Sequence, residues 1–264
     1  QKNVCERFFP RTASERKRKF TDTIKKGEFM GFYYFDYTYL LFLAPAIIIT
    51  MIAQIGVKTT FNKYSKVLNM KGLTGAAAAQ RVLEHGGSLL TQVQMTGGHL
   101  TDHFDPKTNI IRLSQSVYGS ATVSAVGVAA HEAGHAVQYA TGYGPIKFRT
   151  AIYPIVSIGS NLSMPLILIG LLLPVQYNFV VYIGIGLYSL SVLFSLVTLP
   201  VEFNASSRAL RYLEETNSLT ADELVGAKKV LRAAAMTYVA STFVALLSLL
   251  RLILIFGNRR GRQS

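Results

Sequence analysis

Cysteine is almost absent from this chain of 264 residues, which contains only Cys5. A single cysteine excludes an internal disulfide framework and a cysteine-based zinc site, so a bound metal must use nitrogen and oxygen ligands. Acidic residues are also scarce, because 14 Asp and Glu stand against 27 Lys and Arg, for a net charge of +13. The basic residues flank apolar blocks, and no nucleic-acid-binding motif accompanies them. The excess therefore indicates contact with a lipid bilayer and its anionic headgroups, not with nucleic acid.

Half of the residues are hydrophobic, and the mean hydropathy is +0.31. These residues are gathered in long blocks, and about 20 apolar residues are enough to cross the hydrocarbon core of a membrane. The predicted fold class is a mainly α membrane protein with about four transmembrane helices and a small α+β domain. Pro200 is expected to end the third transmembrane helix. The four apolar blocks are residues 37–57, 152–175, 177–199 and 238–256.

The chemistry is concentrated in the stretch HEAGH, which begins at His131. Only two glycines interrupt residues 121–140, so this segment is predicted to be a helix, with Ser120 as its N-cap. On a helix, His131 and His135 lie one turn apart on one face, where two imidazoles can bind one zinc ion. Glu132 follows the first histidine and is placed to act as a general base on a metal-bound water.

A different interpretation of this stretch is a pair of hydrogen-bonded core histidines beside a buried glutamate. It leaves three polar groups on an apolar helix without partners, at a considerable desolvation cost. The chain has only five histidines, and two of them are here. The metal-site interpretation is therefore preferred, with one Zn²⁺ per chain as the expected cofactor. Affinity alone does not exclude other divalent metals.

A catalytic zinc usually has three protein ligands and an open position. Two predicted membrane crossings separate His135 from residue 201, so the chain returns there to the side of the membrane that carries the HEAGH helix. The first carboxylate after this return is Glu202, which is predicted to be the third ligand. The alternative role for Glu202 is to stabilise the dipole at the start of a helix.

Four segments together resemble the YugP-like family of membrane-bound neutral zinc metallopeptidases. They are HEAGHAVQ, LTDHFDP at 100–106, VEFNAS at 201–206 and FYYFDYTYLL near the start of the first block. The resemblance covers roughly residues 30–256 and implies a multi-pass membrane protease, mostly bacterial. More distantly, HExxH followed by E-x-x-A-D is similar to the HtpX type and the CAAX prenyl proteases. Ser206 stands where those relatives have a supporting aspartate.

Several other polar residues are candidates for the site. Ser206 could donate a hydrogen bond in support of the ligands, and Asn204 is a second candidate for this supporting role. His103 lies in a predicted hairpin and either contacts the substrate or the developing oxyanion, or belongs to an ordinary turn. Arg208 either stabilises the charge of the tetrahedral intermediate or is a basic residue at the membrane surface.

The region before the HEAGH helix is soluble in character, and together with that helix it is predicted to form a small α+β zincin-like catalytic domain. We expect a short helix followed by a small sheet, whose hairpin provides an edge strand for an extended peptide. The expected elements are a helix at 74–84, strands at 88–95, 96–101 and 110–114, and a turn at 102–109.

Residues 1–29 are basic, with nine Lys and Arg against four Asp and Glu, and they lack the apolar region of a signal peptide. We expect this segment to be an extension before a natural start at Met30; the alternative is a basic tail on the membrane. The predicted division is 1–29 as this extension, 30–57 as the first transmembrane helix, 58–151 as the catalytic domain, 152–200 as a transmembrane hairpin, 201–236 as helices with the third ligand, and 237–264 as the fourth transmembrane helix and a basic tail.

The side of the membrane that carries the HEAGH helix has more basic residues near the span ends than the opposite side. The positive-inside rule then predicts a multi-pass cell-membrane protein with a cytoplasmic active site and both termini outside.

The predicted function is a zinc-dependent endopeptidase that hydrolyses peptide bonds with metal-activated water and Glu132 as general base. Its partners are a protein or peptide substrate and the lipid bilayer, with no prediction of oligomeric state. One alternative is an intramembrane protease of the site-2 type, but the predicted spans lack the internal aspartate which that class uses. The other is a non-catalytic zinc transporter or sensor, which has no need for Glu132.

Overall fold

The structure is a computed structural model that describes residues 37–98 and 101–257. The basic extension predicted at residues 1–29 and the basic tail after Gly257 lie outside the described residues. The chain divides into two units at Leu43 and Ala44. The described part of the first unit is the beginning of helix α2 (Tyr37–Tyr64), and everything below concerns the second unit.

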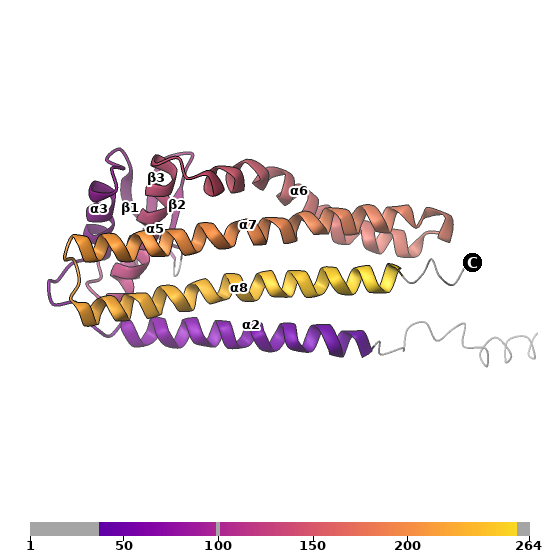
Figure 1. Cartoon of the computed structure of the whole chain (residues 1–264), viewed down its shortest axis with the longest axis horizontal. Coiled ribbons are helices and arrows are strands. Elements are labelled where there is room, and N and C mark those ends of the chain that lie inside the picture. Colours follow the sequence, from indigo (N-terminus) through magenta and orange to yellow (C-terminus); the bar gives the residue numbers. More distant parts are fainter. Residues whose placement is uncertain (1–36, 99–100, 258–264) are drawn as a thin grey trace, which may run out of the picture. The chain divides into compact units, whose positions relative to one another are not determined.

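Within residues 37–98 and 101–257, four helices are long and apolar enough to cross a membrane, which confirms the predicted mainly helical membrane architecture. They are α2, α6 (Gly144–Leu172), α7 (Phe179–Glu215) and α8 (Ala221–Gly257). In Figure 1, α7 and α8 run side by side, and α6 packs along α7. The link between α6 and α7 is a short hairpin with a 3-10 turn at Val175–Tyr177, as expected from its length.

The prediction that Pro200 ends the third transmembrane helix is wrong. Pro200 lies inside α7, which continues without a break to Glu215. Proline removes one backbone hydrogen bond, but helices in membranes tolerate this because neighbouring helices compensate for it. As a consequence, Glu202 is held on the same continuous helix as the apolar segment, and not on a separate helix after it.

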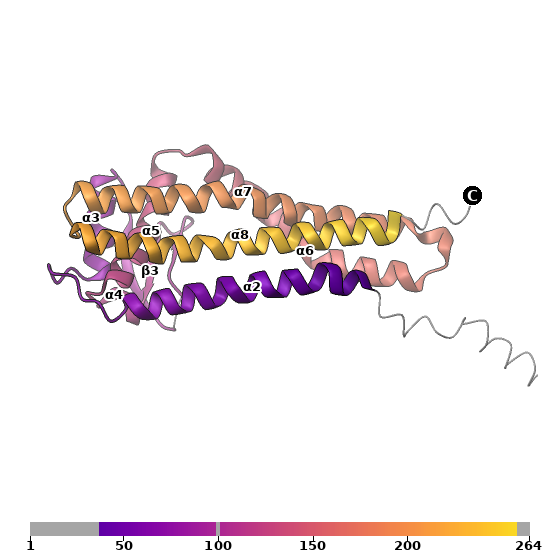
Figure 2. The ribbon, with the colours of Figure 1, turned by 60° about the horizontal axis from the view of Figure 1, so that its bottom comes forward.

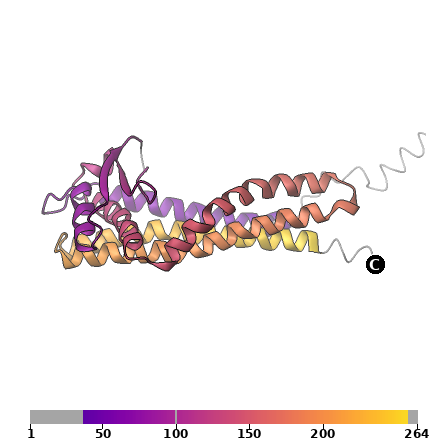
Figure 3. The same ribbon diagram turned by 90° about the horizontal axis from the view of Figure 1, so that it is seen from above.

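A three-stranded sheet precedes the HEAGH helix, with the strands in the order β1-β3-β2. β1 (Gln92–Thr96) is parallel to β3 (Ile110–Ser114), and β2 (His103–Asp105) is antiparallel to β3 and forms an edge. Figure 3 shows this sheet beside α3 (Gly75–His85) and α5 (Val123–Ala140). The short helix α4 (Gln115–Tyr118) joins β3 to α5.

The predicted second strand at 96–101 is wrong, because Gly97, Gly98 and Thr101 are not in a strand, while residues 99–100 lie outside the described residues. The strand is β2 instead, within the segment predicted as a turn. The Asp102 carboxylate explains this position: it accepts hydrogen bonds from Ser114 N at 2.7 Å and Ser114 Oγ at 3.0 Å. These bonds fix the start of β2 against the end of β3.

Helix α5 is the centre of the protein core. Its apolar side chains are buried against α3, α7 and α8, and Figure 2 shows it behind the long helices. The helix begins slightly later than predicted, because Thr122, not Ser120, is its N-cap and accepts from Ala125 N. Burial of α5 on nearly all sides holds its polar residues in a fixed place.

Candidate metal centre

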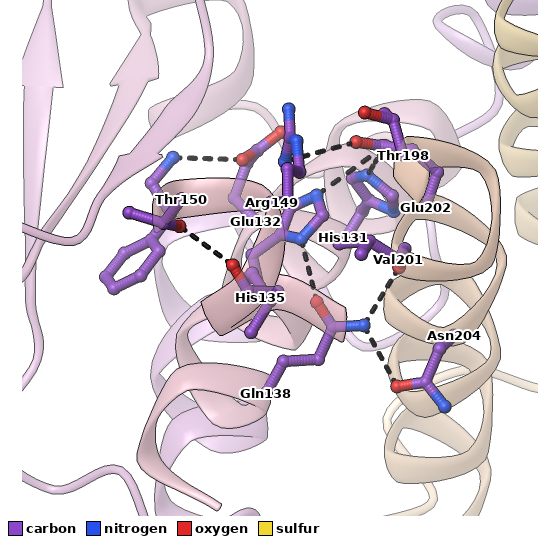
Figure 4. A network of polar contacts seen from close by, with 12 residues as sticks. His131, Glu132, His135, Gln138, Arg149, Thr150, Thr198, Val201, Glu202 and Asn204 are labelled. Carbon is purple, nitrogen blue, oxygen red and sulfur yellow. Dashed lines mark hydrogen bonds and ion pairs between the residues drawn. The ribbon is translucent and has the colours of Figure 1, made fainter. Parts of the chain in front are cut away.

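Three potential metal ligands meet where α5 and α7 cross. His131 and His135 lie on α5, and Glu202 comes from α7. Glu202 Oε2 is 3.3 Å from His131 Nε2 and 3.6 Å from His135 Nε2. Figure 4 shows the two imidazoles turned toward this carboxylate. The structure therefore brings together the three residues predicted as ligands.

The separations between these atoms fit one zinc ion. Two ligands bonded at about 2.0–2.1 Å in tetrahedral directions lie about 3.4 Å apart. Glu202 Oε2 is buried and has no hydrogen-bond partner among the described residues. A buried carboxylate oxygen without a donor is costly, and a cation between it and the two imidazoles removes that cost. The donor set of two imidazoles and one carboxylate is also one that catalytic zinc sites use.

Gly134 is what allows α5 and α7 to approach closely enough. A Cβ atom at this position would lie 2.6 Å from the carbonyl oxygen of Ala205 on α7. No side chain fits at that distance, so the glycine between the two histidines sets the separation of the helices. Ala205 lies three residues after Glu202, which places the close contact within one turn of the third ligand.

Hydrogen bonds to the far nitrogen of each imidazole orient both rings. His131 Nδ1 lies 3.1 Å from Ser206 Oγ, and His135 Nδ1 lies 3.0 Å from Gln138 Oε1. Since an amide oxygen can only accept, His135 Nδ1 carries the proton and its Nε2 is free to bind a metal. Such partners raise the basicity of a ligand and fix its direction. Ser206, predicted as a supporting residue, contacts a ligand directly.

Gln138 is a further supporting residue that the sequence analysis missed. It is fully buried, and its Nε2 donates to Val201 O at 2.8 Å and to Asn204 Oδ1 at 2.9 Å. Asn204 thus reaches the site through Gln138 and not through a ligand. The available signal was position, because Gln138 lies three residues after His135 and seven after His131, on the same face of an apolar helix.

Glu132 joins the HEAGH helix to the edge of the sheet. Its Oε2 accepts a hydrogen bond from Phe104 N, in β2, at 3.0 Å. That N–H points away from β3, so in an antiparallel strand the Phe104 C=O faces the same outer edge. The carboxylate is therefore fixed next to the outer edge of β2, toward which the Phe104 carbonyl group also points.

A cavity of about 190 Å³ contains the candidate ligands and Glu132, and it reaches the start of β2. His103 lines this cavity, and its Nδ1 donates a hydrogen bond to Thr101 O at 2.7 Å, which leaves Nε2 as its second ring nitrogen. Residues of α6 and α8 also line it, among them Arg149 of α6 and Tyr238 of α8. Sequence patterns gave no sign of these two, because only the packing of α6 and α8 brings them to the site.

Arg208, predicted as a possible oxyanion contact, does not line this cavity. Its Nε donates to Asn204 Oδ1 at 2.8 Å, and its guanidinium lies over the ring of Tyr143. The cation nearest the third ligand is instead Arg149, with Nη1 3.7 Å from Glu202 Oε1. Arg149 also lies over the ring of Phe194, which holds it in place.

The carboxylates of the site act on His135. Burial alone lowers the pKa of this imidazole, but the adjacent Glu202 carboxylate and the negative charge of Glu132 outweigh burial and raise the pKa. The metal-free site therefore attracts positive charge, which is the property that a cation-binding site requires.

Comparisons with known proteins identify the family of this chain. A family model described as "Putative neutral zinc metallopeptidase" matches residues 39–257, and the chain belongs to this family. The chain is also 44% identical over 211 residues to the "Putative membrane protease YugP" of Bacillus subtilis (strain 168), a match that covers 80% of this chain and 93% of the relative. The predicted family resemblance is thereby confirmed. No solved structure gives a significant match.

Proposed function

We propose that this protein is a membrane-embedded, zinc-dependent endopeptidase with His131, His135 and Glu202 as metal ligands and Glu132 as general base. The main support for the proposal is the buried Glu202 Oε2, which faces two imidazole Nε2 atoms and has no hydrogen-bond donor within the described part of the chain. A glutamate in this position supports a gluzincin-like peptidase over a site-2-type protease, which uses an aspartate. The small sheet beside α5 is compatible with a zincin-like domain.

A bound zinc ion would act as a Lewis acid and make a water molecule more acidic near neutral pH. Glu132 lies next to the first ligand and accepts a proton from this water as the water oxygen attacks the peptide carbonyl carbon. The same carboxyl group then gives the proton to the leaving nitrogen as the C–N bond breaks. The hydrogen bond from Phe104 N holds the carboxylate in one orientation during both transfers.

The position of β2 supports binding of an extended peptide. A substrate strand that pairs with the outer edge of β2 meets the Phe104 C=O beside Glu132. Backbone pairing of this kind provides affinity for many sequences. His103 lies at the start of β2 in the same cavity, with Nε2 able to accept a hydrogen bond from substrate or, when protonated, to donate one.

For orientation, we propose that the catalytic residues face the cytoplasm, because the basic residues at the span ends favour that side. Sealed vesicles of known orientation test this. Protease added outside inside-out vesicles should cleave residues 60–115, and cleavage of this region in right-side-out vesicles would reverse the assignment.

Hydrolysis by the purified full chain in detergent tests the proposed activity. Wild type and Glu132→Gln should both retain zinc, while Glu132→Gln should lose about 100-fold or more of the cleavage rate on a mixed peptide library, the usual contribution of a general base. Glu84→Gln, an exposed change on α3, is the matched control and should behave as wild type. Equal cleavage by Glu132→Gln and wild type would refute the assignment of the base, and zinc binding without any cleavage would favour a non-catalytic role.

A further inference from the structure

Two adjoining cavities lie between α2 and α8, away from the metal centre. The first has a volume of about 460 Å³ and is lined by apolar residues, among them Ile52 and Gly56 on α2 and Phe243 on α8. The second has a volume of about 420 Å³ and is lined in part by Lys63, Lys229 and Arg232. Thr60, Ala233 and Met236 line both cavities, so the two form one continuous groove, apolar along its length and cationic at one end.

The spacing of the two helices forms this groove, and not the position of a single side chain. Figures 1 and 2 both show residues 44–64 of α2 alongside α8. At the cationic end the helices are in contact, because a Cβ on Gly226 would lie 2.7 Å from the Tyr64 ring. Farther along, a Cβ added at Gly56 would meet nothing within 4 Å. The helices therefore touch at one end and leave open space between them beyond it.

The charges at the mouth of the groove have one sign. Lys63, Lys229 and Arg232 are all exposed, and Lys63 Nζ lies over the ring of Tyr64. Among the described residues, no acidic side chain lines either cavity. Thr59 also lines this end of the groove, and its hydroxyl donates to Ile55 O of its own helix at 2.7 Å.

We propose that this groove binds an anionic phospholipid, with the phosphate at Lys63, Lys229 and Arg232 and one acyl chain between Ile52 and Phe243. Both helices are long and apolar enough to span the bilayer, so the apolar part of the groove lies at the depth of the lipid tails. An acyl chain gains little by leaving other tails for an apolar groove, so selectivity among lipids comes from the headgroup. Basic pockets between membrane helices favour anionic headgroups for this reason.

Helix α8 connects this groove to the metal centre. Met236 lines the groove, while Tyr238, two residues on and on a different face of the helix, lines the metal cavity. A lipid in the groove therefore contacts the helix that forms one wall of the candidate active site.

The chain contains no tryptophan, so a single introduced tryptophan reports on one place only. Phe243→Trp places the reporter in the groove, and Ile158→Trp places one on an exposed face of α6 that lines neither cavity. The full chain is placed in phosphatidylcholine nanodiscs that contain a minor fraction of either brominated phosphatidylglycerol or brominated phosphatidylcholine, and quenching is measured. For the groove reporter, the fraction of brominated lipid that gives half-maximal quenching should be about fivefold lower for phosphatidylglycerol than for phosphatidylcholine. This factor corresponds to the attraction of one basic residue for an anionic headgroup. The α6 reporter should respond equally to both lipids.

Two sets of variants distinguish binding at a specific site from attraction to general surface charge. Added to the groove reporter, Lys63→Gln, Lys229→Gln and Arg232→Gln together should abolish the preference. The matched set Lys58→Gln, Lys66→Gln and Lys228→Gln removes the same charge from exposed positions that line neither cavity and should leave it unchanged. Gly56→Leu fills the apolar part with all charges retained and should weaken quenching by the anionic lipid. Equal quenching by the two lipids at Phe243→Trp, or loss of the preference in the matched set, would overturn the proposal.

Discussion

The contact at Gly134 gives the sharpest prediction for a single methyl group. In Gly134→Ala the new Cβ would be 2.6 Å from Ala205 O, whereas carbon and oxygen atoms approach to about 3.3 Å at closest. The two helices must separate by about 0.7 Å at this crossing to accept the methyl group. Glu202 lies less than one turn away, so its Oε2, now 3.3 Å from His131 Nε2, moves toward about 4.0 Å, beyond the spacing of about 3.4 Å that tetrahedral zinc requires.

We expect Gly134→Ala to lower zinc affinity by about 10–100-fold, the range found when the surroundings of a metal ligand are disturbed. The assay is zinc titration against a chromophoric chelator with the purified full chain. Gly127→Ala is the matched control on the same helix, because its Cβ would meet Ala227 Cβ at an ordinary 3.6 Å. If Gly134→Ala is folded and binds zinc as tightly as Gly127→Ala and wild type, the close crossing does not set the metal site and the reasoning fails.

Three further predictions follow from other contacts. Gln138→Leu keeps the size of the side chain but removes the acceptor for His135 Nδ1. Zinc affinity in the same titration should therefore fall by about tenfold or more. Unchanged affinity would contradict the supporting role of Gln138. Glu223→Ala leaves two part-buried backbone N–H groups without their acceptor, so it should destabilise the protein by about 2 kcal/mol in thermal unfolding. Asp222→Ala, at the exposed neighbouring position, should not destabilise the protein, and equal stability of the two variants would refute this prediction. The pKa of His135 is raised, and below that pKa the imidazole is protonated and cannot bind metal. Zinc affinity should therefore fall as the pH is lowered through neutrality, and zinc binding should release protons in calorimetry. Equal affinities at about pH 6 and pH 8 would contradict this prediction.

The parts of the site that could be predicted are those that follow from local periodicity and from counting membrane crossings. The i and i+4 spacing places His131 and His135 on one face of any helix. The return of the chain after two crossings selected Glu202 as the candidate third ligand, and the structure places it within 3.6 Å of both histidines. Neither inference needed the details of packing.

The parts that could not be predicted depend on tertiary contacts. Arg149 and Tyr238 reach the metal cavity because α6 and α8 pack near α5 and α7, and no local pattern encodes that. Strand β2 was missed because a single half-buried carboxylate, Asp102, turns a segment rich in turn residues into an edge strand. Pro200 predicts a helix end because proline strongly disrupts helices in water, whereas inside α7 it is tolerated.

The most direct test of the central claim is the zinc content of the full chain after dialysis against a weak chelator. Wild type should retain one zinc ion per chain, and so should Glu214→Gln, which removes an exposed carboxylate from the same helix as the third ligand. Glu202→Gln should retain well below one, because the buried oxygen that faces both imidazoles loses its charge. Full zinc content in Glu202→Gln would contradict the account, since the third ligand would then lie elsewhere.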